Sequence, residues 1–195
     1  ANMENKKKRV VAQRIEGKKG STFANYEDEF EYLISAGIAL NVQAISTPTF
    51  PLIESSGKNL LKLYLNDVGI LTSILYGSNI RAILEDERSI NLGSVYESVV
   101  ASELIAHGYN LFYYDNRSKG EVDYLIDDYD SLSAVPIEVK SGKDYTVHSA
   151  LNTFVKNDDY HVKKAYVLSN AREITTNGKI TYLPIYDVMF LQNNS

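Results

Sequence analysis

Two acidic residues and a lysine stand at spacings that suit phosphodiester chemistry. Asp123 lies in a short, largely apolar stretch, and Glu138 and Lys140 flank Val139 in a second one that follows a turn. Side chains alternate along a strand, so Glu138 and Lys140 should share one face while Ile137 and Val139 turn to the other. Carboxylates can hold a divalent cation, and a lysine beside them can orient an attacking water or stabilise negative charge. The pattern therefore predicts a metal-dependent hydrolytic site.

The candidate catalytic residues are Glu97, Asp123, Glu138 and Lys140. The candidate ligands of a Mg²⁺ ion are Asp123, Glu138 and the main-chain carbonyl of Val139, with waters completing an octahedral shell. Glu97 is expected on the inward face of the preceding helix, where it would complete the acidic cluster. Several carboxylates at one place disfavour simultaneous ionisation unless a cation or Lys140 is present.

Alternation along the strand that carries Asp123 makes Glu121 a further acidic candidate. Glu121 and Asp123 should share one face, with Val122, Tyr124 and Ile126 on the other. Many sites of this type need only the aspartate, so Glu121 is the weaker candidate.

Each candidate also has a purely structural interpretation, and these alternatives stay open. Asp123 and Glu138 could be exposed polar residues at strand ends, and Glu97 could be a surface or capping glutamate. Lys140 could form a salt bridge to Asp123 or Glu138, which would hold an inactive site together equally well.

Hydrophobic periodicity and breakers predict the elements that must position these residues. We expect helices at 4–16, from the caps Ser21 and Thr22 to 35, at 67–76 with Asp67 as N-cap, at 94–107 and near 147–156. The longest of these, 94–107, should bury a stripe of Val95, Val99 and Leu104. We expect strands at 38–45, 60–65, 111–114, 121–126, 134–140, 165–168 and 180–183, and a short terminal segment at 185–191. The pattern indicates an α/β fold, a mixed β-sheet flanked by helices. A winged-helix-like α+β segment at 1–76 precedes it, so the predicted domains are 1–76 and 77–195.

Composition narrows the class of protein. The chain has 195 residues, 44% of them hydrophobic, and contains no Cys, which excludes disulfides and thiolate metal sites. The three histidines lie far apart, and no apolar run approaches the roughly 20 residues of a membrane span. We therefore expect a cytoplasmic protein with no membrane partner.

Charge is unevenly distributed along the chain. The first 20 residues carry seven Lys or Arg against two Glu, a local net charge of +5. Because the formal net charge of the whole chain is −5, the remaining residues carry a net charge of −10. A basic arm on an acidic body permits contact with DNA, but a solvated helix face explains the same lysines.

The chain resembles a known family in several separate segments. The C-terminal half, with Glu97, Asp123 and Glu138-Val139-Lys140, resembles the PD-(D/E)xK restriction-endonuclease-like fold. Nearly the whole chain is similar to the C-terminal region of a group of predicted prokaryotic AAA-type ATPases, catalogued as domain of unknown function 4143. The similar segments are 33–38, 51–52, 62–71, 96–104 and the Glu-Val-Asp and Glu-Val-Lys-Ser-Gly strings.

The resemblance implies that an ATPase module would precede this chain in a longer protein. No GxxxxGK[ST] phosphate loop exists in the sequence, and residues 56–59 lack its first glycine and its hydroxyl. ATP would therefore bind only in the absent module, which would also be the partner of this chain and a route to oligomers.

Two functions remain in competition. One is a magnesium-dependent deoxyribonuclease, a hydrolase that cleaves DNA phosphodiesters. The other is an inactive nuclease-like module that binds DNA or a protein and regulates the ATPase, and a DNA-binding winged helix at 1–76 is compatible with either. The helix near 148–156 lacks the glutamine or lysine that some active nucleases of this fold place after Glu-x-Lys. Ser149 and Asn152 could contact phosphates instead, although an ordinary place on the helix surface is the simpler interpretation.

Overall fold

The computed structural model describes residues 23–56, 61–77, 81, 84–85, 92–142 and 144–193. The expected basic helix at 4–16, the caps Ser21 and Thr22 and most of the boundary at 77–92 lie outside these residues. No helix among the described residues has the length and apolar character needed to cross a membrane.

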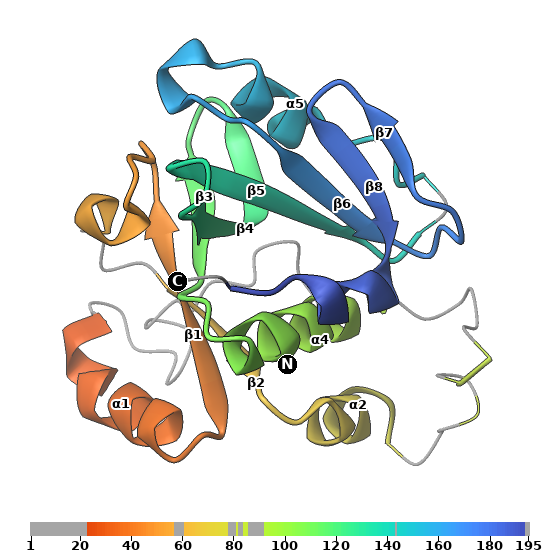
Figure 1. Cartoon of the computed structure of the whole chain (residues 1–195). Helices are drawn as coiled ribbons and strands as arrows, with labels where there is room; N and C mark the ends of the chain where they lie inside the picture. The colour runs from red at the N-terminus through yellow and green to blue at the C-terminus, as the bar shows by residue number, and fades with distance from the viewer. Residues whose placement is uncertain are drawn as a thin grey trace.

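A single mixed sheet of eight strands organises the described part of the chain (Figure 1), in the order β2-β1-β3-β4-β5-β6-β8-β7. The strands are β1 Ala39–Ile45, β2 Leu61–Leu65, β3 Phe112–Asn116, β4 Gly120–Asp128, β5 Ser133–Lys140, β6 Ala165–Ser169, β7 Thr175–Asn177 and β8 Ile180–Pro184. Strand β4 pairs antiparallel with β3 and with β5, whereas β6 pairs parallel with β5 and with β8. The α/β class with a mixed sheet is confirmed.

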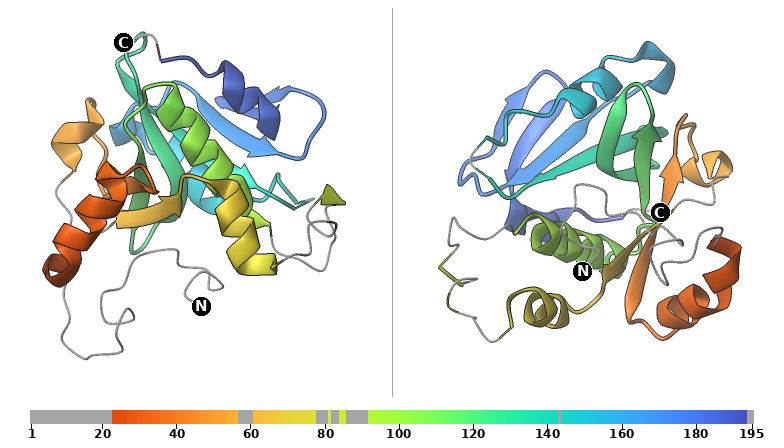
Figure 2. Two further views of the ribbon diagram at one scale, coloured as in Figure 1. Left: turned by 90° about the horizontal axis from the view of Figure 1, so that it is seen from below. Right: turned by 180° about the vertical axis from the view of Figure 1, so that it is seen from behind.

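The helices cover both faces of this sheet. They are α1 Glu27–Ser35, α2 Val68–Tyr76, α4 Gly93–Ala106 and α5 Ser149–Val155, with 3-10 segments η2 Phe23–Tyr26, η3 Leu52–Ser55, η4 Asp158–Tyr160 and η5 Ile185–Phe190. One core cluster joins α4 and η5 to one face through Val100, Ala101, Leu104 and Val188. The other joins η3, α5 and η4 to the opposite face through Leu52, Leu151, Phe154 and Tyr160. Figure 2 shows α4 and α5 on opposite sides of the sheet.

Local signals located most elements correctly. Asp67 caps α2 as expected, because its carboxylate accepts a hydrogen bond of 3.1 Å from the Ile70 N–H. Gly37 and Gly108 follow α1 and α4 with φ of 68° and 83°, the left-handed conformation that ends helices. Strand β7 was not predicted, since its residues are polar and all exposed and carry no apolar alternation.

The predicted buried stripe of α4 is wrong at one position. Val95 and Leu104 are buried, but Val99 is 38% exposed. The face of α4 that meets the sheet instead contains Glu97 and Val100, so a carboxylate occupies a buried position that the apolar pattern alone did not assign.

The expected winged-helix-like segment is not confirmed. Its strands β1 and β2 pair antiparallel with each other, but β1 also pairs parallel with β3, from Gln43↔Phe112 to Ile45↔Tyr114. These strands therefore extend the central sheet. The pairing joins residues far apart in the sequence, so local periodicity could not reveal it.

Candidate functional site

A β-bulge in β4 places Asp123. Strand β3 pairs Phe112 with Leu125 and Tyr114 with Val122, so β4 holds one residue more than β3 between these two pairs. Bulges re-aim side chains and are frequent beside active sites. The Asp123 carboxylate accepts a 2.8 Å hydrogen bond from the main-chain N–H of Val139, and thereby joins the ends of β4 and β5.

The bulge also corrects the predicted alternation along β4. Val122 packs in the cluster on the α5 side of the sheet, whereas Tyr124 and Ile126 pack on the α4 side. The expectation that these three side chains share one face is wrong for Val122, because one extra residue reverses the pattern.

Strand β5 carries Glu138 and Lys140 as its alternation predicts. Ile137 and Val139 pack in the α4-side cluster, so Glu138 and Lys140 turn to the opposite face. Lys140 Nζ lies 2.6 Å from Glu138 Oε1. Glu138 is only 7% exposed, and its Oε2 is buried without a hydrogen-bond partner among the described residues. Such a half-satisfied buried carboxylate is costly unless something further binds it.

Glu97 is buried in α4, also at 7% exposure. The Tyr64 hydroxyl of β2 donates a 3.0 Å hydrogen bond to Glu97 Oε2, and the Tyr124 hydroxyl donates one of 2.8 Å to the Glu97 main-chain carbonyl. Burial raises the pKa of both phenols, so both stay protonated as donors. Neither tyrosine was predicted from the sequence to be functional. The available signal was their place in predicted strands, Tyr64 two residues after Lys62 and Tyr124 next to Asp123.

The four predicted catalytic residues act on one another electrostatically. The pKa of Glu138 is raised to about 8, mainly by burial and then by the charge of Asp123, with a smaller contribution from Glu97, and Lys140 partly offsets these effects. Burial lowers the pKa of Lys140, but the charges of Glu138, Asp123 and Glu97 outweigh it, so the net shift is upward. Asp123, Glu138 and Lys140 thus lie together where β4 and β5 pair, whereas Glu97 lies on the α4 face of the sheet and acts on Glu138 and Lys140 through its charge.

Glu121 has a different partner. Its carboxylate lies 2.6 Å from Nζ of Lys62 in β2, and Lys62 is almost completely buried. The same ammonium sits 4.5 Å from the centre of the Tyr113 ring. The ion pair with Lys62 is therefore a structural role for Glu121, and it needs no part for Glu121 in a site at Asp123.

The described residues contain no group of three or more His, Asp or Glu side chains arranged to hold a metal ion. In the predicted site Lys140 already binds one oxygen of Glu138, and the Val139 N–H binds one oxygen of Asp123. Glu138 Oε2, which has no hydrogen-bond partner among the described residues, could accept a cation.

Residues 92–188 match the family model described as "Domain of unknown function (DUF4143)". This stretch, just under half of the chain, is similar to that family. It runs from the residue before α4 into η5, so it contains all four predicted catalytic residues, whereas β1, β2 and Tyr64 lie outside the match. No curated protein and no solved structure matches the chain.

Proposed function

We propose that the stretch similar to DUF4143 is a nuclease-like domain of the PD-(D/E)xK, restriction-endonuclease-like kind that hydrolyses DNA phosphodiesters with Mg²⁺. The observation that carries the proposal is the buried Oε2 of Glu138, which has no hydrogen-bond partner among the described residues, in a carboxyl group whose pKa is shifted by the charges of Asp123, Lys140 and Glu97. Burying Glu97 and Glu138, with a third acid, the half-buried Asp123, and one lysine nearby, is unfavourable for stability alone. A function that needs clustered acids gives a physical reason for the arrangement.

The donor set fits a hard divalent cation in part. Asp123, Glu138 and the Val139 carbonyl would hold the ion, because all supply oxygen and Glu138 has one oxygen without a partner. Bound there, the cation would acidify the attacking water and neutralise charge on the phosphodiester.

The chain's own residues have separable roles in this proposal. Lys140 would orient the attacking water and stabilise negative charge that develops on the phosphate. Glu97 would add negative charge behind the site, held by its bond from Tyr64. Asp123 would also keep β4 and β5 in register through the Val139 N–H.

A second function has its own supporting observation. Lys140 forms an ion pair of 2.6 Å with Glu138, the arrangement expected of a site closed for structural reasons. In this alternative the domain does not cleave, but binds DNA or a protein and regulates an ATPase.

Resemblance supports the wider setting that we propose. The chain would follow a AAA-type ATPase module in the parent protein, which would bind ATP, form the oligomer and be the chain's own partner. A DNA contact through the basic residues of 1–20, and a winged-helix-like role for 1–76 within a cytoplasmic protein, belong to the same proposal.

The test is cleavage of labelled single-stranded, duplex and branched DNA with Mg²⁺ or Mn²⁺. The variants are Asp123→Asn, which keeps an acceptor for the Val139 N–H, and Lys140→Met; the control is Asp158→Asn on the exposed surface of η4. Metal-dependent cutting that is lost in both site variants and kept in the control supports a nuclease. Cutting that survives in both site variants removes the site. An intact, folded protein that cuts none of these DNAs favours the binding module.

A further inference from the structure

A groove of about 560 Å³ lies between α5 and the β7–β8 hairpin, outside the four predicted catalytic residues. Tyr145, His148, Asn152, Lys156, Lys179 and Tyr182 are the lining residues that could recognise a ligand. The volume is within the range of about 300–1,000 Å³ typical of small-ligand sites.

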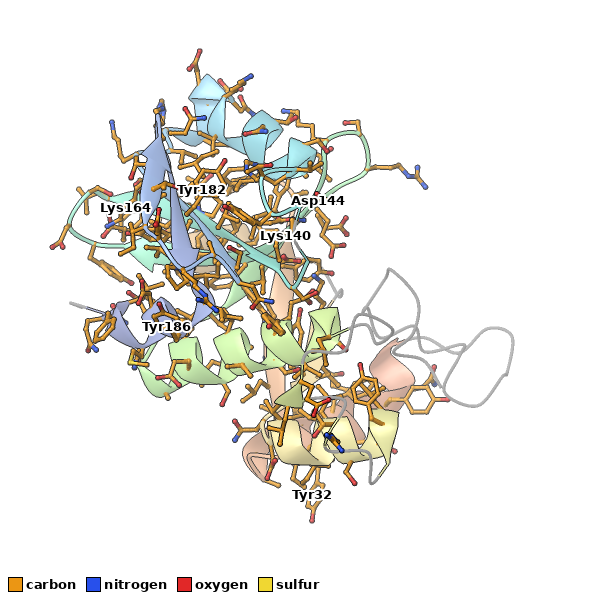
Figure 3. The ribbon with its side chains drawn as sticks, turned by 90° about the vertical axis from the view of Figure 1, so that its right-hand side faces the viewer. Tyr32, Lys140, Asp144, Lys164, Tyr182 and Tyr186 are labelled. Atoms are coloured by element: carbon orange, nitrogen blue, oxygen red, sulfur yellow. The ribbon has the colours of Figure 1, made fainter. Side chains whose placement is uncertain are left out.

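Sheet register fixes the groove relative to Glu138. Glu138 pairs with Val167 of β6, and Val167 pairs with Tyr182 of β8, so the three residues form one row across the sheet. Val167 and Tyr182 belong to the α5-side cluster, and Glu138 turns to that face as well. Neighbouring strands are about 4.8 Å apart, so Tyr182 stands roughly 10 Å from Glu138 along the row. Figure 3 shows Lys140 and Tyr182 in the part of the sheet next to α5.

Two lysines give the groove its charge. Lys156 and Lys179 line it, and no acidic residue is among its described lining residues, although the chain as a whole is acidic. His148 adds no charge at neutral pH, since burial and then the charge of Lys140 lower its pKa. An acidic protein with a lysine-lined groove beside its acidic site is suited to an anionic ligand that reaches both.

Aromatic and amide groups complete the groove. Tyr145 is half-buried and packs edge-on to Tyr182, with ring centres 6.0 Å apart. A 2.8 Å hydrogen bond between His148 Nε2 and the Tyr182 hydroxyl fixes the wall behind it. The Asn152 amide can both donate to and accept from a base edge. A tyrosine face can stack only on a base that is free of its own helix.

We infer that this groove binds one or two nucleotides of an unpaired DNA strand adjacent to the phosphodiester held at Glu138 and Lys140. The inference rests on the proposed function for the position of the scissile bond, but binding in the groove does not require cleavage. The lysines contact the flanking phosphates, and Tyr145 stacks on a base. The 10 Å offset corresponds to a nucleotide one or two places from the reacting phosphate.

The test is fluorescence anisotropy of a labelled ten-nucleotide thymidine strand, with a ten-base-pair duplex for comparison, in EDTA at low salt. The variants are Tyr145→Ala and the double substitution Lys156→Gln/Lys179→Gln; the matched control is the exposed Lys163→Gln, which does not line the groove. We expect each groove variant to weaken single-strand binding about fivefold or more. The control should stay within about twofold, because one remote lysine adds little to a local contact.

The outcomes separate this inference from the nuclease proposal. Groove-dependent binding without cleavage under any metal condition upholds the groove and rejects the nuclease. Cleavage by wild type with unchanged binding in both groove variants overturns the groove and keeps the nuclease. Duplex bound as tightly as single strand, or no single-strand binding by wild type, also overturns the groove.

Discussion

The Tyr64 hydroxyl donates a 3.0 Å hydrogen bond to the Glu97 carboxylate and so connects β2, outside the DUF4143 match, to α4 inside it. Both side chains are buried, and the Tyr64 ring also packs 5.8 Å from that of Tyr124. The segment before residue 92 therefore supplies a contact that the domain's own acidic cluster depends on.

Removing this hydroxyl should destabilise the fold. Tyr64→Phe leaves the buried Glu97 Oε2 without its tyrosine donor, and we expect the free energy of unfolding to fall by about 1–3 kcal/mol. Urea denaturation measures the change. Tyr32→Phe, at a tyrosine that is 70% exposed, is the control and should change stability by less than about 0.5 kcal/mol. Equal effects of the two substitutions would contradict a supporting role for the bond.

Glu138 should make stability depend on pH. Its pKa in the folded protein, about 8, lies above that of an ordinary glutamate, so the folded state binds more protons between about pH 4.5 and 8. The stabilisation of the fold that Glu138 provides is then complete below about pH 4.5 and is lost as the pH rises through about 8. Glu138→Gln should be more stable relative to wild type at pH 9 than at pH 5, by about 1–3 kcal/mol. The exposed Glu31→Gln is the control, and a pH-independent difference for Glu138→Gln would refute the assignment.

The buried ion pair should behave unlike an exposed one. Glu121→Gln leaves Lys62, which is 1% exposed, with a buried charge, and should cost about 3 kcal/mol. Adding Lys62→Met should recover part of that loss. The matched control is Glu85→Gln in the Arg81–Glu85 pair, whose N–O distance of 2.7 Å is similar but whose side chains are 85% and 56% exposed. That change should cost less than about 1 kcal/mol. If the double variant is less stable than Glu121→Gln, the unpaired charge of Lys62 is not the cause of the loss, and the Lys62 side chain contributes to stability in another way.

Magnesium should stabilise the fold if the acidic cluster binds it. At a concentration about tenfold above its Kd, Mg²⁺ should raise the Tm of wild type by about 3–6 °C. Asp123→Asn should abolish the shift, while Asp158→Asn should keep it. Thermal melts with Mg²⁺ and with EDTA provide the measurement, and an equal shift in both variants would place the ion elsewhere.

Gly120 should be intolerant of a side chain for two reasons. Its φ is 94°, and a Cβ there would lie 3.0 Å from Cβ of Ala150 in α5. Gly120→Ala should therefore destabilise by about 2–3 kcal/mol. Gly178→Ala separates the two causes, because Gly178 has φ 61° and open space around it, and should cost only about 1 kcal/mol. Similar losses at both positions would show that contact with α5 adds nothing.

Local signals predicted much of the fold. The Asp67 cap, the glycines after α1 and α4, and the alternation that separates Glu138 from Val139 all depend on residues within one element. Strand β7 and the exposure of Val99 could not be predicted from local signals. Strand β7 lacks apolar residues, and the exposure of Val99 depends on which side of α4 the sheet covers.

The sequence by itself determined the mixed α/β class and the residue types of the acidic cluster, because side-chain alternation and helix spacing follow from backbone geometry. Only the tertiary structure decided how β1 joins β3, where β4 bulges at Asp123, that Glu121 pairs with Lys62, and that Tyr64 reaches Glu97. Three of these are contacts between elements distant in the chain, and the bulge is an irregularity in the pairing of β3 with β4. All four depend on strand register and helix placement, which the whole core sets through packing rather than any one segment through its own pattern.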